Sequence, residues 1–326
     1  MQNLMRTQPL TLAENAMDAL TIDGLKCYYV NDYFGVRREI RAVDDISLTI
    51  RKNEIYGIAG ESSSGKTSLI KTLAGAIRPP MRVVGGTVKF NFADGPIDVY
   101  GEPGKMKAAR WRHLSYIMQG SMNVLNPVRR VKHAFTDFAS RHMNLDPAAT
   151  AHRFKGAKSR AEKEALADIA LQRVGLSMAE IKGRFSHELS GGQLQRIAVA
   201  RALIPEPKLI VADEPVSMVD ASLRMSIVNL FRDLRDALNV SIVYITHDLA
   251  TAYYISDRVV IMRKGVVVES GDARDVLEHP KHVYSIALKN AVLPPNPREA
   301  SAILRLRQRN AETNEATSGS GDRLAR

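Results

Sequence analysis

Along the middle of the chain, the spacing of apolar residues switches between the periods of strands and of helices. Residues 54–59 form a short apolar run followed by a glycine, and residues 67–76 follow at helical spacing. Residues 209–212 and 240–245 are β-branched runs, which are typical of strands buried on both faces. This alternation predicts an α/β domain built around a mostly parallel sheet.

Two further patterns extend this prediction. Residues 258–262 and 266–269 flank the dipeptide Lys264-Gly265, which predicts an antiparallel hairpin at the sheet margin. Between about residues 121 and 195, apolar residues recur at helical spacing. We therefore expect a helical subdomain inserted into the α/β core.

Composition narrows the classes of protein that fit. The chain has 326 residues, of which 45% are hydrophobic and 25% charged, so it is long enough to bury a substantial core. No apolar run reaches the length needed to cross a bilayer, and the first residues lack the pattern of a secretory signal. A single cysteine, Cys27, excludes an intramolecular disulfide and a thiolate cluster. These features favour a protein that stays in the cytoplasm.

The strongest motif is a glycine-rich loop between a predicted strand and a predicted helix. Residues 60–67 satisfy G-x-x-x-x-G-K-[ST]. Its glycines let backbone N–H groups surround phosphate oxygens, Lys66 can neutralise the β and γ phosphates, and the Thr67 hydroxyl can bind Mg²⁺. The loop residues predicted to bind nucleotide are Gly60, Glu61, Ser62, Ser63, Ser64, Gly65, Lys66, Thr67 and Ser68.

Two adjacent carboxylates follow another predicted strand. Asp213 and Glu214 come directly after residues 209–212. Because open α/β sheets bind ligands beyond the carboxyl ends of their strands, both acids are expected near the glycine-rich loop. Asp213 can then hold the Mg²⁺ shell, and Glu214 can orient or deprotonate an attacking water.

A third motif, Leu189-Ser190-Gly191-Gly192-Gln193, precedes a helical stretch. By itself it is either an ordinary helix N-cap or a second anion site. Taken with the other motifs, it resembles the LSGGQ signature of the ATP-binding subunits of ABC transporters. The resemblance runs from about Leu25 to Leu288. It implies that Ser190, Gly191, Gly192 and Gln193 close over the ATP held by the opposite subunit.

The resemblance implies roles for further residues. Gln119 matches a glutamine that senses Mg²⁺ and the transmembrane partner, His247 matches a histidine that contacts the γ-phosphate, and Asp220 matches an aspartate that touches the other subunit. Tyr29 is the predicted aromatic residue that stacks on adenine, with Tyr28 and Tyr33 as alternatives. The resulting catalytic residues are Glu214, His247 and Gln119, and the resulting metal ligands are Thr67, Gln119 and Asp213.

The chain departs from the family pattern at three places. Ser63 replaces a usual glycine, Met218-Val219 replaces the commoner Ala-Leu, and Gly120-Ser121 stands where an acidic residue and a proline are frequent. None of these changes removes a catalytic group. We therefore expect an active ATP hydrolase.

Other stretches indicate a branch of the family. IRPPMRVVGGTV and GDARDVLEHPKHVYSIALKNAVLPPNP resemble the importer branch for oligopeptides, nickel and oligosaccharides, and THDLATAYYISDR is similar to subunits that serve oligosaccharide uptake. The resemblance implies a peripheral subunit on the cytoplasmic face of the membrane. Its implied partners are a second, similar or identical ABC ATPase subunit, two transmembrane permeases and, indirectly, an extracytoplasmic solute-binding protein.

The formal net charge of +11 is concentrated in one segment. Between Lys105 and Arg160, the sequence contains twelve Lys or Arg residues but only two acidic residues, Asp137 and Asp146. Such a segment is either a solvated face or a contact for nucleic acid, anionic lipid or an acidic partner. Because the family's inserted helices face the membrane subunits, we hypothesise that it lies near anionic lipid headgroups.

Three functions other than transport fit parts of the sequence. A soluble ABC ATPase acting on nucleic acid or ribosomes fits the charge, but the second cassette, coiled coil or zinc ligands usual in such proteins are not in the sequence. A P-loop kinase or GTPase has no use for LSGGQ or His247, and a binding-only module has no use for Glu214. We therefore expect no nucleic-acid partner.

The predicted domain plan has three parts. Residues 1–18 form a mobile tail, residues 19–288 form the ABC ATP-binding domain, and residues 289–326 form an extension that is flexible from about 308. Within the ABC domain, the catalytic core comprises residues 19–120 and 196–288. The helical subdomain comprises residues 121–195.

Overall fold

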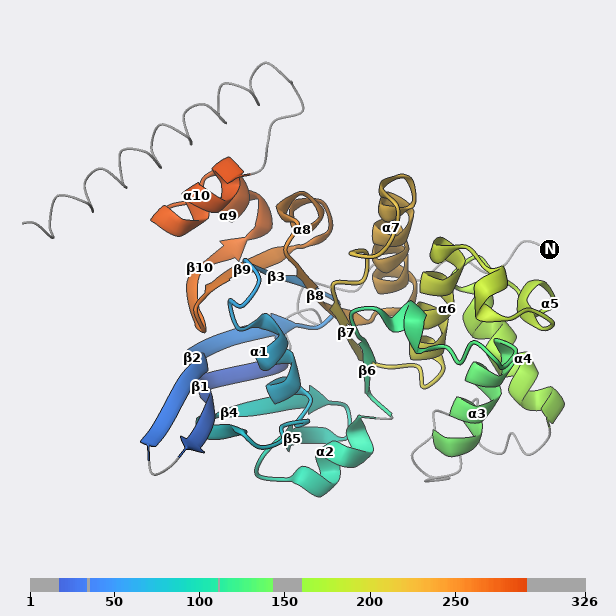
Figure 1. Cartoon of the computed structure of the whole chain (residues 1–326), viewed down its shortest axis with the longest axis horizontal. Helices are drawn as coiled ribbons and strands as arrows, with labels where there is room; N and C mark the ends of the chain where they lie inside the picture. The colour runs from blue at the N-terminus through green and yellow to red at the C-terminus, as the bar shows by residue number, and fades with distance from the viewer. Residues whose placement is uncertain (1–17, 34–35, 111, 143–159, 292–326) are drawn as a thin grey trace, which may run out of the picture. The chain divides into compact units, whose positions relative to one another are not determined.

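The computed structural model describes residues 18–33, 36–110, 112–142 and 160–291 (Figure 1). The chain divides into two compact units, residues 1–279 and 280–326. The described part of the second unit contains α10 (Val283–Ala291). Both predicted tails lie outside the described residues, except that Asp18 opens the first strand.

A six-stranded sheet forms the centre of the first unit. Its strand order is β10-β9-β3-β8-β7-β6, with parallel pairing from β9 to β6 and antiparallel pairing between β9 and β10. The strands are β3 (Ile55–Ala59), β6 (Leu114–Ile117), β7 (Leu209–Asp213), β8 (Ser241–Thr246), β9 (Arg258–Arg263) and β10 (Val266–Asp272). The hairpin predicted at the sheet margin is therefore β9 and β10.

The central strands are apolar throughout because both of their faces are covered. In β7, Ile210 and Ala212 pack in one hydrophobic cluster with the helices that follow β6, whereas Leu209 and Val211 pack in another with α1. Successive strand residues point to opposite faces, so a strand between two layers needs an apolar residue at every position. This is why the sequence of β7 is a nearly continuous run of apolar residues.

A second sheet, of four antiparallel strands in the order β2-β1-β4-β5, faces the first across α1 (Lys66–Leu73). Its strands are β1 (Asp18–Tyr33), β2 (Val36–Arg51), β4 (Met81–Phe92) and β5 (Gly95–Asp98). α1 buries Leu69, Ile70 and Leu73 in the cluster that both sheets share. It ends earlier than predicted because Gly75 takes a left-handed conformation, with φ +57°.

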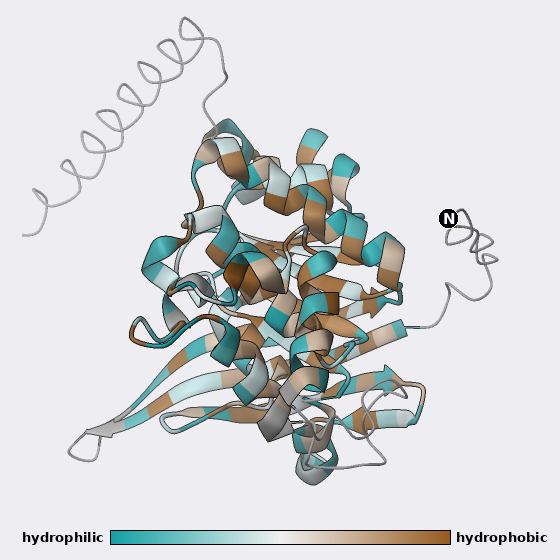
Figure 2. Cartoon of the chain, turned by 90° about the vertical axis from the view of Figure 1, so that its right-hand side faces the viewer, coloured by the Kyte–Doolittle hydropathy of each residue, from teal (hydrophilic) through white to brown (hydrophobic). Residues whose placement is uncertain are grey.

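Of the remaining helices, α2 (Pro103–Ala109) packs beside β5 of the four-stranded sheet, and the others lie around the six-stranded sheet and extend beyond it (Figure 1). Hydrophobic and hydrophilic stretches alternate along them, as expected for helices with one packed face (Figure 2). Within the described ranges, no helix has the length and hydrophobicity that a membrane span requires. These helices are α2 (Pro103–Ala109), η2 (Ser121–Val124), α3 (Lys132–His142), α4 (Arg160–Gln172), α5 (Met178–Ile181), η3 (Ser186–Glu188), α6 (Gly191–Leu203), α7 (Ala221–Leu238), α8 (Leu249–Ile255) and α9 (Ala273–Glu278).

Candidate functional site

Four predicted site segments meet at the carboxyl edge of the six-stranded sheet. Ala59 of β3 pairs with Thr246 of β8, and Asp213 of β7 pairs with Ile245. The phosphate loop, Glu214 and His247 directly follow these strand ends, and Gln119 follows the neighbouring β6. The parallel register therefore brings together residues that lie far apart in the sequence.

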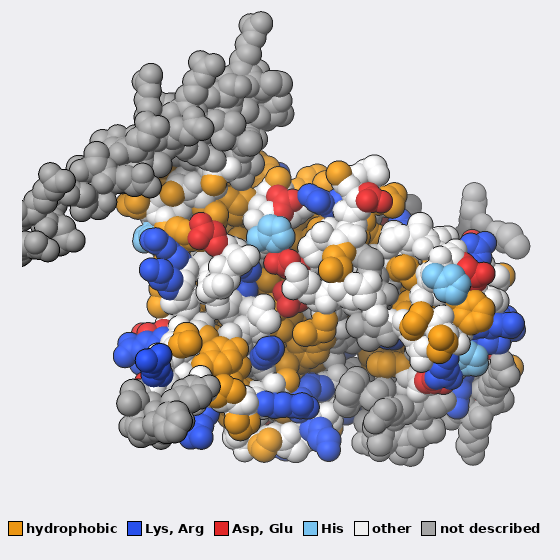
Figure 3. All heavy atoms as spheres, viewed as in Figure 1, with side chains coloured by type: hydrophobic (Ala, Val, Ile, Leu, Met, Phe, Trp, Pro, Cys, Tyr) orange, Lys and Arg blue, Asp and Glu red, His pale blue; other side chains and the backbone are white. Residues whose placement is uncertain are grey.

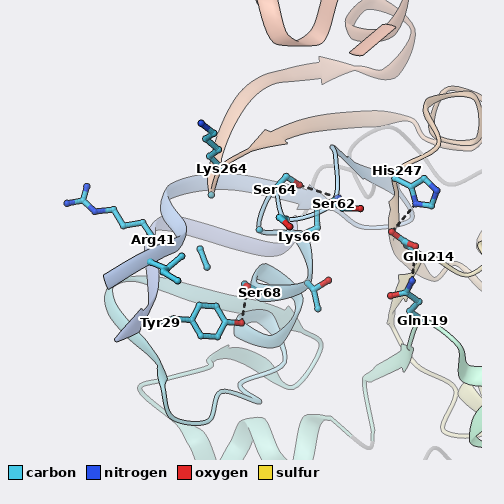
Figure 4. A pocket seen from close by; sticks show the side chains of 16 residues that line it. Tyr29, Arg41, Ser62, Ser64, Lys66, Ser68, Gln119, Glu214, His247 and Lys264 are labelled. Atoms are coloured by element: carbon cyan, nitrogen blue, oxygen red, sulfur yellow. Dashed lines mark hydrogen bonds and ion pairs between the residues drawn. The ribbon is translucent and has the colours of Figure 1, made fainter. Parts of the chain in front are cut away.

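A pocket of about 720 Å³ lies at this edge (Figure 4). Most of the predicted nucleotide residues line it, together with side chains from β2 and from the β9–β10 turn. Its lining consists of Tyr29, Ile40, Arg41, Ala42, residues 62–68, Gln119, Glu214, His247, Lys264 and Gly265.

Lys66 occupies the centre of the phosphate loop. Its side chain is 6% exposed, and Nζ donates to the Gly60 carbonyl at 2.6 Å, the Glu61 carbonyl at 2.7 Å and Ser64 Oγ at 3.2 Å. The loop therefore wraps around the ammonium and fixes its position. Burial lowers the pKa of Lys66, and the charge of Glu214 opposes that shift.

The loop is packed tightly against neighbouring backbone at Gly65. This residue has φ +106°, and a Cβ on it would lie 2.2 Å from the carbonyl oxygen of Ala42. The β9–β10 turn also holds the loop, because Gly265 N donates to the Ser64 carbonyl at 2.8 Å. Only glycine fits at Gly65, because both the conformation and the space exclude a side chain.

Glu214 lies between two polar side chains. Gln119 Nε2 donates to Glu214 Oε2 at 3.1 Å, and His247 Nδ1 donates to Oε1 at 3.0 Å (Figure 4). The backbone of Glu214 has φ +46°, an uncommon conformation for a residue with a side chain. The carboxylate is thus held by both of its oxygens at the rim of the phosphate-binding loop.

Asp213 is the buried partner of this acid pair. It is 4% exposed, and burial together with the neighbouring charge of Glu214 raises its pKa to about 6. The charges of Lys66 and Lys71 offset this rise only in part, so a further cation would stabilise the charged form of Asp213. The oxygens of Asp213, of the Thr67 hydroxyl and of the Gln119 amide are of the kind that Mg²⁺ prefers. The donor set therefore fits a magnesium ion.

Tyr29, the predicted adenine-stacking residue, lies at the nucleotide pocket. It lines the pocket, and its hydroxyl lies 3.2 Å from Ser68 Oγ of α1. Tyr28 instead donates its hydroxyl to Asp44 and is not part of the pocket lining. The side chain of Tyr33 lies outside the described residues. The role of Tyr29 stays a prediction that this geometry supports.

The signature residues do not line the pocket of their own chain. Ser190 caps α6: its Oγ accepts from Gln193 N at 3.2 Å, and Gln193 Oε1 accepts from Ser190 N at 3.0 Å. Asp220 opens α7, is exposed and caps no backbone N–H. Within one chain, these residues are therefore separate from the nucleotide pocket.

Five lining residues were not predicted from the sequence: Ile40, Arg41, Ala42, Lys264 and Gly265. The dipeptide Lys264-Gly265 was predicted only as a turn. It reaches the pocket because β9 pairs in parallel with β3, with Ile261 opposite Ala59. The side chains of Arg41 and Lys264 extend outward from the pocket rim (Figure 4).

Comparison with known proteins identifies the family. A family profile described as ABC transporter matches residues 43–217. A peptide import ATP-binding protein of Brucella abortus (strain 2308) is 37% identical over 265 residues, covering 79% of this chain and 71% of that protein. The chain belongs to the ABC transporter family. A second relative, a peptide import ATP-binding protein of Brucella ovis, is 35% identical to this ABC transporter chain over 258 residues. The match covers 79% of this chain and 74% of the relative.

Solved structures share the fold of this ABC transporter chain. The dimeric structure of MJ0796, a bacterial ABC transporter cassette, has a TM-score of 0.62 at 22% identity and covers 78% of this chain and 99% of its own. CbiO1 from Clostridium perfringens has a TM-score of 0.62 at 23% identity and covers 88% of this chain and 98% of its own. The predicted fold, a P-loop NTPase core with parallel and antiparallel sheets, is confirmed. The chain is an ATP-binding ATPase whose hydrolysis is coupled to transmembrane transport.

Proposed function

We propose that this ATPase powers the import of peptides, working as one half of a nucleotide-sandwich dimer on the cytoplasmic face of the membrane. The peptide import named for both Brucella relatives supports this cargo. The oligosaccharide cargo suggested by THDLATAYYISDR has no support among these relatives, so peptides are preferred. The proposed partners are a similar or identical ATPase subunit, two permeases and, indirectly, an extracytoplasmic solute-binding protein.

The position of Glu214 is the main observation that supports the proposal. Its carboxylate accepts from Gln119 and from His247 at the mouth of the pocket that contains Lys66. In the proposed reaction, Glu214 takes a proton from water as the water oxygen bonds to the γ-phosphorus, and the bond to the β-phosphate oxygen breaks. His247 and Lys66 stabilise the charge on the transferring phosphoryl group.

Magnesium has a defined place in this proposal. Thr67, Gln119 and Asp213 would hold it, and when bound it would neutralise charge on the β and γ phosphates. Because Gln119 donates its Nε2 to Glu214, its Oε1 is the atom that can face the cation. Gln119 would therefore connect the metal to the carboxylate that activates water.

A second subunit is proposed to complete the site. Ser190 to Gln193 and Asp220 lie outside the pocket of their own chain, and the first backbone N–H groups of α6 make a helix N-terminus suited to phosphate. The Ser190 hydroxyl accepts from Gln193 N and so still has its own proton to donate. Placed over the pocket of a neighbouring subunit, this segment would bind the γ-phosphate from the opposite side.

The test replaces Glu214 with Gln, which keeps the side chain's size and removes the base. In cells that lack the native gene, E214Q should fail to restore uptake of radiolabelled oligopeptides, although the wild-type chain restores it. The purified variant should bind ATP with unchanged affinity and hydrolyse it about 100-fold or more slowly. Normal uptake of peptides without any copy of the gene would contradict the proposed cargo. Normal hydrolysis by E214Q would contradict the role of Glu214.

A further inference from the structure

The ring of His247 is held by little packing. Its side chain is 55% exposed, and its Nδ1 is bonded to Glu214 Oε1 at 3.0 Å (Figure 4). Histidine and acidic side chains are exposed together near the centre of the face shown in Figure 3. Solvent does not restrict the rotation of a side chain, so an exposed ring needs a firmly held backbone to keep its place. The position of His247 therefore depends on the residues on either side of it.

A small polar network holds these neighbouring residues. Thr246 and Thr251 are both 3% exposed, and their hydroxyl oxygens lie 3.3 Å apart. Asp248 N donates to Thr246 Oγ1 at 2.9 Å, and the Asp248 carbonyl accepts from Thr251 Oγ1 at 2.9 Å. The Asp248 carboxylate also caps α8, since its Oδ1 accepts from Ala250 N at 2.9 Å. The network thus fixes Asp248 directly beside His247.

The second carboxylate oxygen of Asp248 contacts α7. Arg224 Nη1 lies 3.5 Å from Asp248 Oδ2, whereas the nitrogen and oxygen of a well-formed ion pair approach to about 2.8 Å. Arg224 Nε is buried and has no hydrogen-bond partner among the described residues. A movement of the guanidinium therefore breaks no hydrogen bond at Nε within the described part of the chain. In the single chain, the pair between Arg224 and Asp248 is only partly formed.

Arg224 belongs to the first turn of α7, which also contacts other parts of the proposed site. Arg224 N donates to the carbonyl of Asp220, the predicted dimer contact, at 3.0 Å. The adjacent Leu223 packs against the signature segment, residues 190–193, because a Cβ on Gly192 would lie 3.0 Å from Leu223 Cδ1. This turn therefore connects the signature segment and the predicted dimer contact to the backbone that carries His247.

We propose that Arg224 is a positioning residue that places His247 at the γ-phosphate by holding the carboxylate of Asp248. This inference rests on the proposed function, because it concerns the reaction that His247 supports in the dimer. Contact of a second subunit with the N-terminus of α7 shortens the distance between Arg224 and Asp248 from 3.5 Å to about 2.8 Å. The shorter, charge-assisted bond then fixes the backbone of His247 while ATP is bound.

Other contacts between α7 and α8 lie farther from His247. The guanidinium of Arg232 stacks over the ring of Tyr254 at 5.3 Å, and the Tyr254 hydroxyl donates to Asn229 Oδ1 at 2.8 Å. Arg232 follows Arg224 in the same helix by about two turns. It joins the same two helices without contacting the network beside His247, so it provides a matched control.

The first experiment measures ATP hydrolysis by Arg224→Gln and Arg232→Gln, in the assembly in which the wild-type chain is active. R224Q should lower kcat by about tenfold and leave KM for ATP unchanged, because the phosphate loop is intact. R232Q should leave both constants unchanged. Arg224→Lys restores the charge and should recover most of kcat. A wild-type kcat in R224Q would overturn the proposal.

Melting temperatures provide the control for folding. Both arginine contacts are partly exposed, so R224Q and R232Q should melt within about 4 °C of the wild type. A merely structural role of Arg224 would lower the melting temperature and leave kcat of the folded protein unchanged. That result would also overturn the proposal.

The second experiment tests whether Arg224 acts through His247. ATP hydrolysis by H247A and by R224Q/H247A is followed by the release of radiolabelled phosphate. If Arg224 acts only by positioning His247, R224Q should cause no further loss of kcat once the ring is removed. A double variant whose loss is the product of the two single losses would show that Arg224 acts elsewhere.

The single variant H247A separates the inference from the proposed function. If H247A keeps the wild-type kcat, the proposed role of His247 is wrong, and the inference fails with it. If H247A lowers kcat and R224Q does not, only the inference is wrong and the proposed function stands.

Discussion

Ser63 occupies a backbone conformation that suits glycine better. Its φ is +67°, in the left-handed region. A left-handed conformation destabilises a residue with a side chain by about 1–2 kcal/mol, while glycine loses about 0.5–1 kcal/mol through its freedom in the unfolded chain. We therefore expect Ser63→Gly to raise the free energy of unfolding by about 0.5–1 kcal/mol in urea titrations.

The neighbouring Ser62 provides the control for this prediction. It is also exposed in the loop but is not among the described residues with positive φ. Ser62→Gly should lower the free energy of unfolding by about 0.4–1 kcal/mol, because only the entropy term remains. Equal losses in both variants would show that the conformation of Ser63 carries no strain.

His113 gives the stability of the fold a dependence on pH. Its ring stacks on Phe92 at 4.6 Å between centroids and is 13% exposed. Burial, followed by the charge of Arg112, lowers the pKa of His113, and Asp94 only partly offsets this. The unfolded chain then binds a proton at His113 more readily than the folded chain does. The free energy of unfolding therefore keeps its full value, as far as His113 is concerned, above about pH 6.5 and decreases as the pH falls below that value.

His113→Gln tests this linkage. The variant should lose less stability than the wild type between pH 7 and pH 5 in urea titrations, because the unfolded state no longer gains that proton. An unchanged or steeper loss in H113Q would exclude His113 as a source of the pH dependence.

At the scale of elements, α5 and α6 begin with the same capping arrangement. Ser177 and Glu180 form a reciprocal capping box, as Ser190 and Gln193 do. Replacing either serine with Ala should lower the free energy of unfolding by about 1 kcal/mol. If Ser190 also binds phosphate across a dimer, S190A should lower the ATPase rate by about tenfold or more, and S177A should leave it unchanged. Equal ATPase rates in the two variants would restrict Ser190 to a capping role.

The helices and strands could be predicted where one local pattern decided them. β3, β7 and β8 were evident because strands covered on both faces are continuous apolar runs. The 16-residue strands β1 and β2 were not assigned, because their register contains bulges and their outer faces are polar. A bulge shifts the alternation of side chains, so the period of two is interrupted.

Much of the candidate site could also be predicted, since its residues lie in short motifs. Lys66, Glu214 and His247 each follow a strand end, and the sheet brings these ends together. Arg41 and Lys264 could not be predicted, because the approach of β2 to the phosphate loop and the pairing of β9 with β3 are long-range contacts without a local signal.

At the scale of the whole molecule, the proposed site is divided between two copies. One chain supplies the phosphate loop, Glu214 and His247 around the pocket, while its own signature segment lies outside that pocket. In the proposed dimer, ATP bound in one pocket should hold two subunits together until it is hydrolysed.

The most direct test measures the mass of the E214Q chain in solution by light scattering. Samples contain either this chain alone or an equimolar mixture with a candidate second ABC ATPase subunit. With Mg²⁺ and ATP, at least one of these two samples should contain a complex of about twice the 36.0 kDa mass of the chain. The same sample with ADP in place of ATP should contain separate subunits. Ser190→Ala, added to E214Q, should weaken that complex. Separate subunits at saturating ATP in both samples would contradict the shared site.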